Sequence, residues 1–286
     1  MSNRKKIIVT GASGQLGSEI MELAGDYPGL ELMFFTREQL SIDDEAAVRD
    51  LFEKENPAGC INAAAYTAVD KAESDREAAF RINAYAVGNL ASACRSCDAF
   101  LVHVSTDYVF PGKNTRPYRE DDLINPVNTY GASKAEGEIL ALKNNPETFI
   151  IRTSWLYGRK GHNFVRTMQR LMGERHKLGV VNDQEGSPTN AADLAAVILK
   201  MITSPGKVAP GIYHFSNSGT TTWFGFASAI KELTGTSCDV FPVDTAAFPT
   251  PAKRPAYSVM DTSKISTALG FQIPGWRESL EEFLRG

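Results

Sequence analysis

The feature that most constrains this chain is the stretch KIIVTGASGQLG at residues 6–17, where a β-branched run meets a turn with three glycines. Glycines let the backbone turn tightly and let its N–H groups approach a pyrophosphate. A helix that begins near Gln15 would point its positive end at the same phosphates. Although a plain glycine-rich turn is the alternative, the order of strand, turn and helix predicts a dinucleotide-binding turn. We expect its contacts to come from Gly11, Ser13, Gly14, Gln15, Leu16 and Gly17.

Short apolar runs alternate with helix-length segments through the first half of the chain. After the first run, they lie at residues 30–35, 59–65, 99–105 and 148–154. Runs that are apolar on both faces are typical of parallel strands covered by helices on both sides. Strands that alternate with helices form a doubly wound sheet with right-handed crossovers. The chain is therefore predicted to be α/β, with a Rossmann-like doubly wound parallel sheet.

This alternation loosens after about residue 155. HKLGVV and GIYHFS still resemble strands, with the helical pattern AADLAAVILKMI between them, but the other segments are short and rich in proline. This composition indicates a smaller, discontinuous C-terminal substrate lobe. We expect an NAD(P)-binding Rossmann domain at residues 1–155 and a substrate-binding lobe at 156–286, with roughly 178–215 returning to the Rossmann sheet.

Composition argues against two classes of protein. The net charge of −4 and the sequence pI near 5.7 disfavour a nucleic-acid partner, which would need a basic surface. No apolar run approaches the roughly 20 residues that span a bilayer. The apolar run near the N-terminus is also shorter than that of a signal peptide. We therefore expect no membrane partner and a cytoplasmic location.

Four cysteines are too few for a disulfide scaffold in 286 residues. Cys94 and Cys97 form a C-x-x-C pair, but this pair falls at the end of an apparent helix, away from the N-terminus that would lower a thiol pKa. No second cysteine pair or histidine pair completes a metal site. The cysteines are therefore interpreted as structural.

The end of the second predicted strand bears on the choice of cofactor. An acid at this position binds a free ribose 2′-hydroxyl, whereas an arginine accommodates a 2′-phosphate. The segment FFTREQL offers Arg37 and no acid at the strand tip, which favours NADPH without excluding NADH. Asp43 is either a helix N-cap or an adenine contact. Small residues after the third strand either contact the cofactor or form a packing seam, and these are Ala63, Ala64 and Ala65.

Tyr130 and Lys134 stand four residues apart in a segment expected to be helical, which places both side chains on one helix face. An ammonium beside a phenol favours the phenolate, so we expect the pKa of Tyr130 to be lowered from about 10. Such a tyrosine can exchange a proton with a carbonyl or alcohol oxygen. Thr106 ends the fourth predicted strand at the edge where doubly wound sheets bind ligands, and its hydroxyl could hold that oxygen. The alternative for the pair is a solvated helix face.

These motifs together resemble the extended short-chain dehydrogenase/reductase superfamily. Over nearly its whole length the chain is similar to the dTDP-4-dehydrorhamnose reductases. The matching stretches are GASGQLG, NAAAYTAVDKAE, STDYVFPG, YGASKAEGE, RTSWLYG, NFVRTM, DQEGSPT and PTPAKRP.

This resemblance implies NADPH-dependent reduction of a dTDP-linked 4-keto-6-deoxy sugar to dTDP-L-rhamnose, a donor for cell-surface polysaccharide. It implies that Thr106 binds the keto oxygen, that Tyr130 donates the proton, and that Lys134 holds the cofactor ribose and tunes Tyr130. It places Thr67, Val69, Tyr108 and Trp155 around the sugar. Candidates for the diphosphate end are Asn163, Lys253 and Arg254, although Arg254 could instead be a surface charge.

The resemblance is weaker at a metal site. The resemblance implies that, in some members of the family, two glutamates bind magnesium and so bridge the subunits of a dimer. Glu19 matches the first, but Ala192 stands in place of the second, with Asp193 next to it. This substitution argues against magnesium, so no metal site is expected, while a metal-free homodimer stays open.

Three alternatives are distinguished by their chemistry: a nucleotide-sugar dehydratase, an epimerase and a non-catalytic subunit. A nucleotide-sugar dehydratase needs a second acid beside the strand-tip threonine, whereas here Asp107 is followed by Tyr108. An epimerase retains its cofactor and consumes none. A non-catalytic subunit, like the regulatory β subunit of methionine adenosyltransferase that resembles these reductases, would show no turnover.

Overall fold

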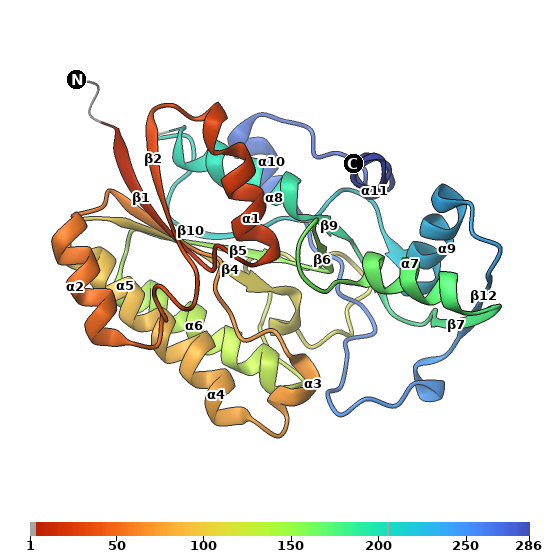
Figure 1. Ribbon diagram of the computed structural model, residues 1–286. Helices are drawn as coiled ribbons and strands as arrows, with labels where there is room; N and C mark the ends of the chain where they lie inside the picture. The colour runs from red at the N-terminus through yellow and green to blue at the C-terminus, as the bar shows by residue number, and fades with distance from the viewer. Residues whose placement is uncertain (1–3, 205) are drawn as a thin grey trace.

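The computed structural model describes residues 4–204 and 206–286. Its central layer is a sheet of six strands in the order β10-β5-β4-β3-β1-β2, and every neighbouring pair is parallel (Figure 1). The strands are β1 (Lys5–Thr10), β2 (Leu30–Phe35), β3 (Gly59–Asn62), β4 (Phe100–Thr106), β5 (Thr148–Thr153) and β10 (Gly211–His214). The predicted Rossmann-like parallel sheet is thereby confirmed.

Helices cover both faces of the sheet (Figure 1). One face carries α1 (Gln15–Leu23), α8 (Ala191–Ile202) and α10 (Ser263–Leu269). The other face carries α2 (Glu45–Glu55), α3 (Val69–Ala72), α4 (Arg76–Phe80), α5 (Ala86–Ser96) and α6 (Thr129–Asn144), with a π-helical turn η2 (Arg81–Tyr85) between α4 and α5.

Strand β1 shows why the sheet is covered on both sides. Ile7 and Val9 are buried in the core that also contains residues of α1 and α8, whereas Ile8 points into the opposite core with residues of α2 and α5. Successive side chains of a strand face opposite sides, so a run of apolar residues needs a core on each. The β-branched run thus accounts for the position of β1 inside the sheet.

Side-chain caps fix where several helices begin. Asn128 accepts a hydrogen bond from the Gly131 N–H at the start of α6, and Asp44 accepts one from the Ala47 N–H at the start of α2. These bonds satisfy backbone donors that have no partner inside the helix. The cap of α2 is therefore Asp44, so of the two roles considered for Asp43 the structure excludes the N-cap of this helix.

The strand order determines where a ligand can bind. The chain runs from β1 to β2 on one side and then crosses back to β3 on the other. The strand order therefore reverses at β1, which opens a crevice at its carboxyl end. Doubly wound sheets bind their ligands at such a crossing point. The glycine turn after β1 and the residues after β3 meet there.

A smaller lobe lies beyond the carboxyl ends of the strands, on the right of Figure 1. Its apolar core includes Tyr157, Met168 and Phe226. Its elements are β6 (Leu156–Tyr157), α7 (Phe164–Glu174), β7 (Lys177–Val181), β8 (Glu185–Gly186), β9 (Thr189–Asn190), β11 (Thr221–Thr222), α9 (Trp223–Thr234), β12 (Asp239–Val243) and α11 (Trp276–Arg285). The described residues also form three short 3-10 turns: η1 (Ala24–Asp26), η3 (Asp107–Val109) and η4 (Thr245–Ala247).

The segment expected to return to the main sheet, residues 178–215, is divided between the two parts of the molecule. α8 packs against α1, and β10 extends the sheet beside β5. β7 instead pairs in parallel with β12, while β8 pairs with β11 and β9 with β6, all within the lobe. The expectation is therefore wrong for residues 178–190. The physical reason is that β12, β11 and β6 supply strand partners within the lobe. The proposed division near residue 155 stays a prediction.

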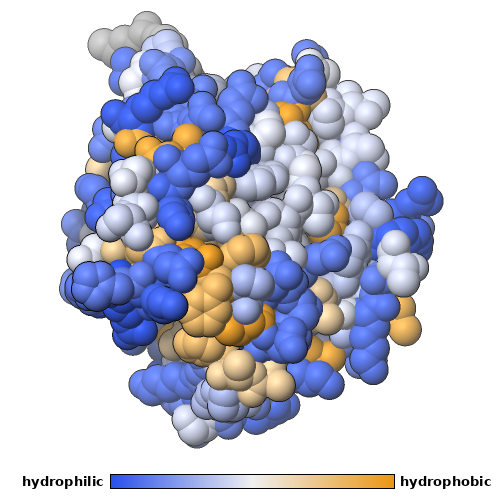
Figure 2. All heavy atoms as spheres, turned by 90° about the vertical axis from the view of Figure 1, so that its right-hand side faces the viewer, coloured by the Kyte–Doolittle hydropathy of each residue, from blue (hydrophilic) through white to orange (hydrophobic). Residues whose placement is uncertain are grey.

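Figure 2 shows the lobe end of the molecule, where hydrophilic residues cover much of the surface and hydrophobic residues gather in patches between them. Exposed apolar side chains of the lobe include Phe241 and Phe248. In the part of the chain that the structure describes, no helix is both long and apolar enough to span a membrane.

All four cysteines are free thiols, and burial raises the pKa of the Cys94 thiol.

Candidate active site

A cavity of about 700 Å³ opens at the carboxyl edge of the sheet, between the sheet and the lobe. This volume lies within the range of about 300–1,000 Å³ that is usual for ligand pockets. Most of the residues predicted from the sequence line it: Gly11, Ser13, Gly14, Gln15, Leu16, Arg37, Asp43, Ala63, Ala64, Ala65, Thr67, Val69, Thr106, Tyr108, Tyr130, Lys134 and Trp155. Four predicted residues do not line it: Gly17, Asn163, Lys253 and Arg254.

The glycine turn has the close backbone approach that a dinucleotide site needs. Gly11 has φ +70°, and a Cβ there would lie 2.6 Å from the Ala64 nitrogen. A Cβ on Gly17 would lie 2.3 Å from the Gly11 oxygen, so Gly17 serves the packing of α1 on the turn. Gly14 occupies the N-cap position of α1 without a side-chain cap. The turn therefore leaves room for a phosphate at the positive end of α1, and the residues present fit a dinucleotide.

Charged residues surround the rim beyond β2. Arg37 is exposed and lines the cavity. Asp43 accepts a hydrogen bond from the Ser41 hydroxyl and forms an ion pair with Arg81 at 3.1 Å. The hydrogen bond from Ser41 is the main cause that lowers the pKa of Asp43. Asp43 thus lines the cavity as a fixed carboxylate, while the guanidinium of Arg37 is the accessible cation of this rim.

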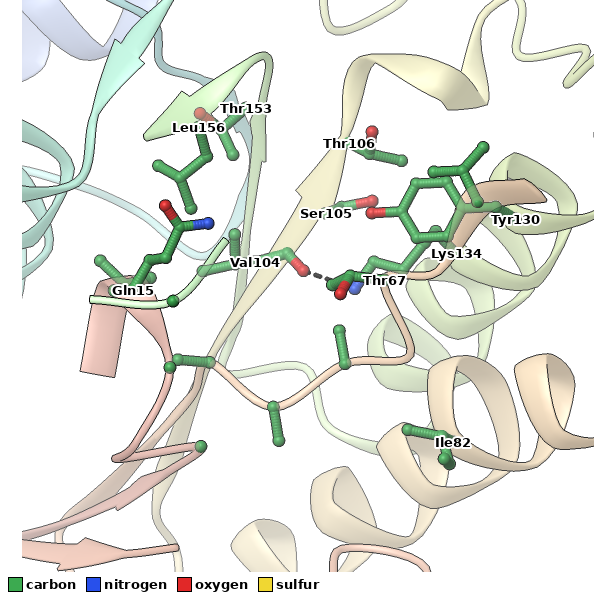
Figure 3. Close-up of a pocket in the computed structure, with 18 of the residues that line it drawn as sticks. Gln15, Thr67, Ile82, Val104, Ser105, Thr106, Tyr130, Lys134, Thr153 and Leu156 are labelled. Carbon is green, nitrogen blue, oxygen red and sulfur yellow. Dashed lines mark hydrogen bonds between the residues drawn. The ribbon is translucent and has the colours of Figure 1, made fainter. Parts of the chain in front are cut away.

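The first turns of α6 bring Tyr130 and Lys134 to the end of β4. In Figure 3 both side chains point from α6 toward the strand that carries Ser105 and Thr106. The ring of Tyr130 packs edge to face against Tyr108, with centroids 5.8 Å apart. The Nζ of Lys134 donates a hydrogen bond to the Val104 carbonyl at 2.6 Å, drawn as the dashed line in Figure 3.

The expected direction of the Tyr130 pKa is wrong in this structure. Burial raises the pKa of Tyr130 to about 12, the Asp107 carboxylate adds to the rise, and the Thr106 hydroxyl lowers it in part. Burial also lowers the pKa of Lys134 to about 8, against the opposing effect of Glu138. The low dielectric of the site disfavours both charged forms, so desolvation outweighs the attraction that the sequence predicted.

Asp107 is a buried carboxyl that the sequence analysis did not place in the site. It lines the cavity, and its Oδ1 accepts a hydrogen bond from the Thr106 hydroxyl at 2.9 Å. Its Oδ2 has no hydrogen-bond partner among the described residues. Burial raises the pKa of Asp107 to about 7. Its position directly after the predicted threonine was the available signal, but its burial could not be read from the sequence.

The lobe contributes two stacked tryptophans. The rings of Trp155 and Trp223 lie 3.6 Å apart and nearly parallel, and both line the cavity. Trp155 has φ +48°, which is uncommon for a residue with a side chain. Trp223 was missed because it follows Trp155 only after 67 intervening residues of the lobe. Ser105, which stands beside Thr106 at the predicted strand end, also lines the cavity. Other lining residues that the sequence did not indicate are Leu40, Ser41, Ile42, Ile82, Val104, Thr153, Ser154, Leu156, Gly161 and His162.

The three candidates for the diphosphate end have other contacts. Asn163 caps α7 through the Arg166 N–H, and its Nδ2 donates to the Gly158 carbonyl at 2.8 Å. Lys253 is exposed. Arg254 is half-buried and pairs with Asp70 at 2.8 Å. These contacts engage Asn163 and Arg254 with the protein itself, so their roles toward a substrate stay predictions.

The acidic residues at the positions compared with a magnesium site, Glu19 and Asp193, also form hydrogen bonds within the chain. Glu19 is buried and accepts a hydrogen bond from the Arg159 N–H at 3.2 Å. Asp193 accepts hydrogen bonds from Asn217 and Ser279. Among residues 4–204 and 206–286, no three His, Cys, Asp or Glu side chains are grouped so as to hold a metal ion.

The glycine turn after β1, the hydroxyl at the tip of β4 and the helix with the Tyr-x-x-x-Lys motif line one cavity at the edge of a parallel sheet. This combination defines a Rossmann-type oxidoreductase of the extended short-chain dehydrogenase/reductase superfamily. The sequence model described as the RmlD substrate binding domain matches residues 5–286. The chain therefore belongs to this family.

Named relatives align with nearly the whole chain. It is 42% identical over 280 residues to the spore coat polysaccharide biosynthesis protein SpsK of Bacillus subtilis (strain 168), covering 98% of this chain and 97% of the relative. It is 41% identical over 286 residues to the dTDP-4-dehydrorhamnose reductase of Aggregatibacter actinomycetemcomitans, covering 96% and 97%. The resemblance predicted from the sequence is confirmed.

Solved structures agree with this assignment. The dTDP-4-dehydrorhamnose reductase of Clostridium acetobutylicum superposes with a TM-score of 0.94 at 42% identity, covering 98% of both chains. The enzyme of that name from Bacillus anthracis strain Ames, solved in complex with NADP, gives a TM-score of 0.94 at 41% identity and covers 99% of both chains.

Proposed function

We propose that this chain catalyses the NADPH-dependent reduction of the 4-keto group of dTDP-6-deoxy-L-lyxo-4-hexulose to dTDP-L-rhamnose. The observation that carries the proposal is the convergence of Thr106, Tyr130 and Lys134 on the cavity whose other end is the glycine turn. The relatives named dTDP-4-dehydrorhamnose reductase support the substrate, and the NADP complex from Bacillus anthracis supports the cofactor.

The chemistry requires a hydride for the keto carbon and a proton for its oxygen. A bound nicotinamide dinucleotide supplies the hydride. Tyr130 holds a proton on its phenol oxygen at neutral pH, because burial raises its pKa to about 12. As negative charge develops on the keto oxygen, Tyr130 donates this proton as a general acid.

The neighbouring side chains orient this step. Thr106 lies beside Tyr130, and its hydroxyl binds the same keto oxygen in our proposal. In this structure that hydroxyl donates its one proton to Asp107 Oδ1, so in our proposal it turns to the keto oxygen when the substrate binds. Lys134, one helical turn after Tyr130, holds the cofactor ribose and stabilises the phenolate that remains after proton donation.

Trp155 and Trp223 form an aromatic wall on the lobe side of the cavity. Aromatic faces suit the apolar face of a sugar or a nucleobase. We propose that this wall, with Tyr108, Thr67 and Val69, contacts the substrate. A homodimer and a cytoplasmic location belong to the same proposal.

A cofactor-oxidation assay tests the reaction directly. Purified protein is mixed with NADPH and a panel of nucleotide-linked 4-keto-6-deoxy sugars, and the loss of NADPH absorbance is followed. We expect sustained, stoichiometric oxidation with the dTDP-linked keto sugar. An epimerase or dehydratase would convert sugar without net NADPH oxidation, and a regulatory subunit would show no turnover.

Replacing the proton donor gives the first specific prediction. Tyr130→Phe should lower kcat by about 10² or more, the scale of a lost general acid, with little change in NADPH affinity. Tyr85→Phe is a matched control, because Tyr85 is exposed and does not line the cavity. Steady-state kinetics of both variants provide the measurement, and a Tyr130→Phe variant with wild-type turnover would disprove the role of Tyr130.

A further inference from the structure

We propose that His103 is a positioning residue that sets the protonation of Lys134 from behind the active site, in an orientation imposed by Asn62. This inference rests on the proposed function, in which the Lys134 ammonium acts with Tyr130. The residues concerned form a buried polar line through the sheet, from Thr10 on β1 to Asn62 on β3, His103 on β4 and Lys134 on α6.

Each link in this line is a close polar contact. The Thr10 hydroxyl donates to Asn62 Oδ1 at 2.7 Å, and Asn62 Nδ2 lies 3.0 Å from His103 Nδ1. His103 Nε2 lies 3.2 Å from the Nζ of Lys134. All four side chains are at most 1% exposed. Buried polar groups without water must satisfy one another, so the proton positions follow from the partners.

The Asn62 amide can point only one way. Its Oδ1 also accepts from the Ala64 backbone N–H at 3.2 Å, and a backbone N–H can only donate. The amide NH₂ therefore faces His103 Nδ1, which must accept. Burial and the nearby Lys134 charge hold the pKa of His103 well below its usual value, so its ring is neutral. The single ring proton must then be on Nε2, pointing at Lys134.

This arrangement opposes the charged form of Lys134. An ammonium has only donors, so its N–H groups and the His103 Nε2–H face each other without an acceptor between them. The neutral amine would instead accept the His103 proton while still donating to the Val104 carbonyl. Burial lowers the pKa of Lys134 to about 8, and in our inference the Nε2–H of His103 acts in the same direction.

The other charged groups around Lys134 do not remove this effect. Glu138 lies one turn further along α6 and raises the pKa of Lys134, but its carboxylate is also bound to the buried guanidinium of Arg152 at 2.7 Å. On the cavity side, Tyr130 keeps its proton through this pH range because burial raises its pKa to about 12, whereas Asp107, with a pKa of about 7, is largely ionised by pH 8. His103 is thus the neighbour whose hydrogen orientation decides the balance.

The Asn62→Asp variant reverses the orientation with almost no change in shape. A carboxylate at this position accepts from Thr10, from Ala64 and from a proton on His103 Nδ1, which leaves Nε2 as an acceptor for the Lys134 ammonium. The pKa of Lys134 should rise. We expect the basic limb of the kcat/KM profile, near pH 8 in the wild type, to move upward by at least one pH unit.

A double variant separates the effect of the His103 tautomer on Lys134 from direct electrostatic attraction between Lys134 and the new carboxylate. In a His103→Phe background, adding Asn62→Asp should leave the basic limb within a few tenths of a pH unit. An equal shift with and without the imidazole, or no shift in Asn62→Asp alone, would overturn the inference.

A second measurement does not depend on turnover or on the folding of a variant. Nitrogen-15 NMR of the wild-type protein labelled at histidine reports which ring nitrogen of His103 carries the proton. The expected result is the Nε2–H tautomer. A proton on Nδ1 would overturn the inference even if the reductase activity is confirmed, and absence of that activity would leave the tautomer result readable.

Discussion

Single residues in this site are governed more by burial than by their charged neighbours. Tyr130 and Lys134 lie one helical turn apart, yet both pKa values move toward the neutral form. Asp107 behaves in the same way. A protein interior penalises each isolated charge before any pairing is counted, and the pairs here are not close enough to compensate. Tyr130 is therefore a neutral acid at pH 7, whereas Asp107 and Lys134, with pKa values of about 7 and 8, titrate close to it.

Asp107 should make stability depend on pH. Its pKa is raised from an ordinary 3.8 to about 7, so between these values the folded chain keeps a proton that the unfolded chain has released. Stability from this group is present at low pH and is lost as the pH rises through this range. Asp107→Asn should therefore be more stable than the wild type at pH 8 by on the order of a few kcal/mol, and much closer to it at pH 4.

Urea unfolding at pH 4, 6 and 8 measures this difference. Asp50→Asn serves as the control, because the Asp50 side chain is 73% exposed and should show no such trend. A gap between Asp107→Asn and wild type that does not widen with pH would contradict the assigned pKa.

Arg37 provides a prediction about cofactor choice. It is the exposed cation at the end of β2, beside the cavity. Charge-assisted hydrogen bonds contribute about 1.5–3 kcal/mol, so Arg37→Ala should raise the KM for NADPH roughly tenfold or more and change the KM for NADH little. Kinetics with both cofactors decide the matter, and equal effects would place Arg37 away from the 2′-phosphate.

At the scale of elements, the position of α6 depends on close approach to the π-helical turn η2. Gly137 of α6 faces this turn, and a Cβ there would lie 2.0 Å from the Asn83 carbonyl oxygen. Asn83 in turn donates to the Ser133 hydroxyl on the same helix at 3.0 Å. The contact between Gly137 and η2 lies about one turn beyond Lys134, so it fixes the helix that carries the catalytic pair.

Two glycine substitutions test this packing. Gly137→Ala should destabilise the protein by roughly 1–3 kcal/mol, because overpacking outweighs the better helix propensity of alanine. Gly173→Ala in α7 has nothing within 4 Å of the added carbon and should be neutral or stabilising by up to about 1 kcal/mol. Chemical denaturation of both variants measures the contrast, and equal effects would mean that α6 can shift without cost.

Elements of the main sheet could be predicted because their signal is local. The first five strands are β-branched or apolar runs that a doubly wound sheet buries on both faces, and the structure confirms each of them. The sequence of a strand does not specify which other strand it pairs with. HKLGVV has the same pattern, but it forms β7 and pairs with β12, which is far along the chain.

At the scale of the whole molecule, the sheet side of the site was predictable from motifs, whereas on the lobe side the family resemblance indicated Trp155 but not Trp223. Gly11, Thr106 and Tyr130 follow strands or begin helices in recognisable motifs, so their meeting at one edge follows from the topology. Trp223 and Asp107 have no such motif. Trp223 reaches the cavity because the lobe folds over the sheet, and the burial of Asp107 depends on that same covering.

The route of the chain between the two parts has a practical consequence. From β5 it enters the lobe at β6, returns through β9 into α8 and β10, and leaves again for β11, α9 and β12. It then returns to the sheet face at α10 and ends in the lobe at α11. Excising the lobe as a single segment would also remove β10, an edge strand of the sheet, together with α8. A chimera that exchanged the lobe to accept another sugar would need matched junctions at each of these crossings, so retargeting is better attempted by point substitutions in the wall formed by Trp155 and Trp223.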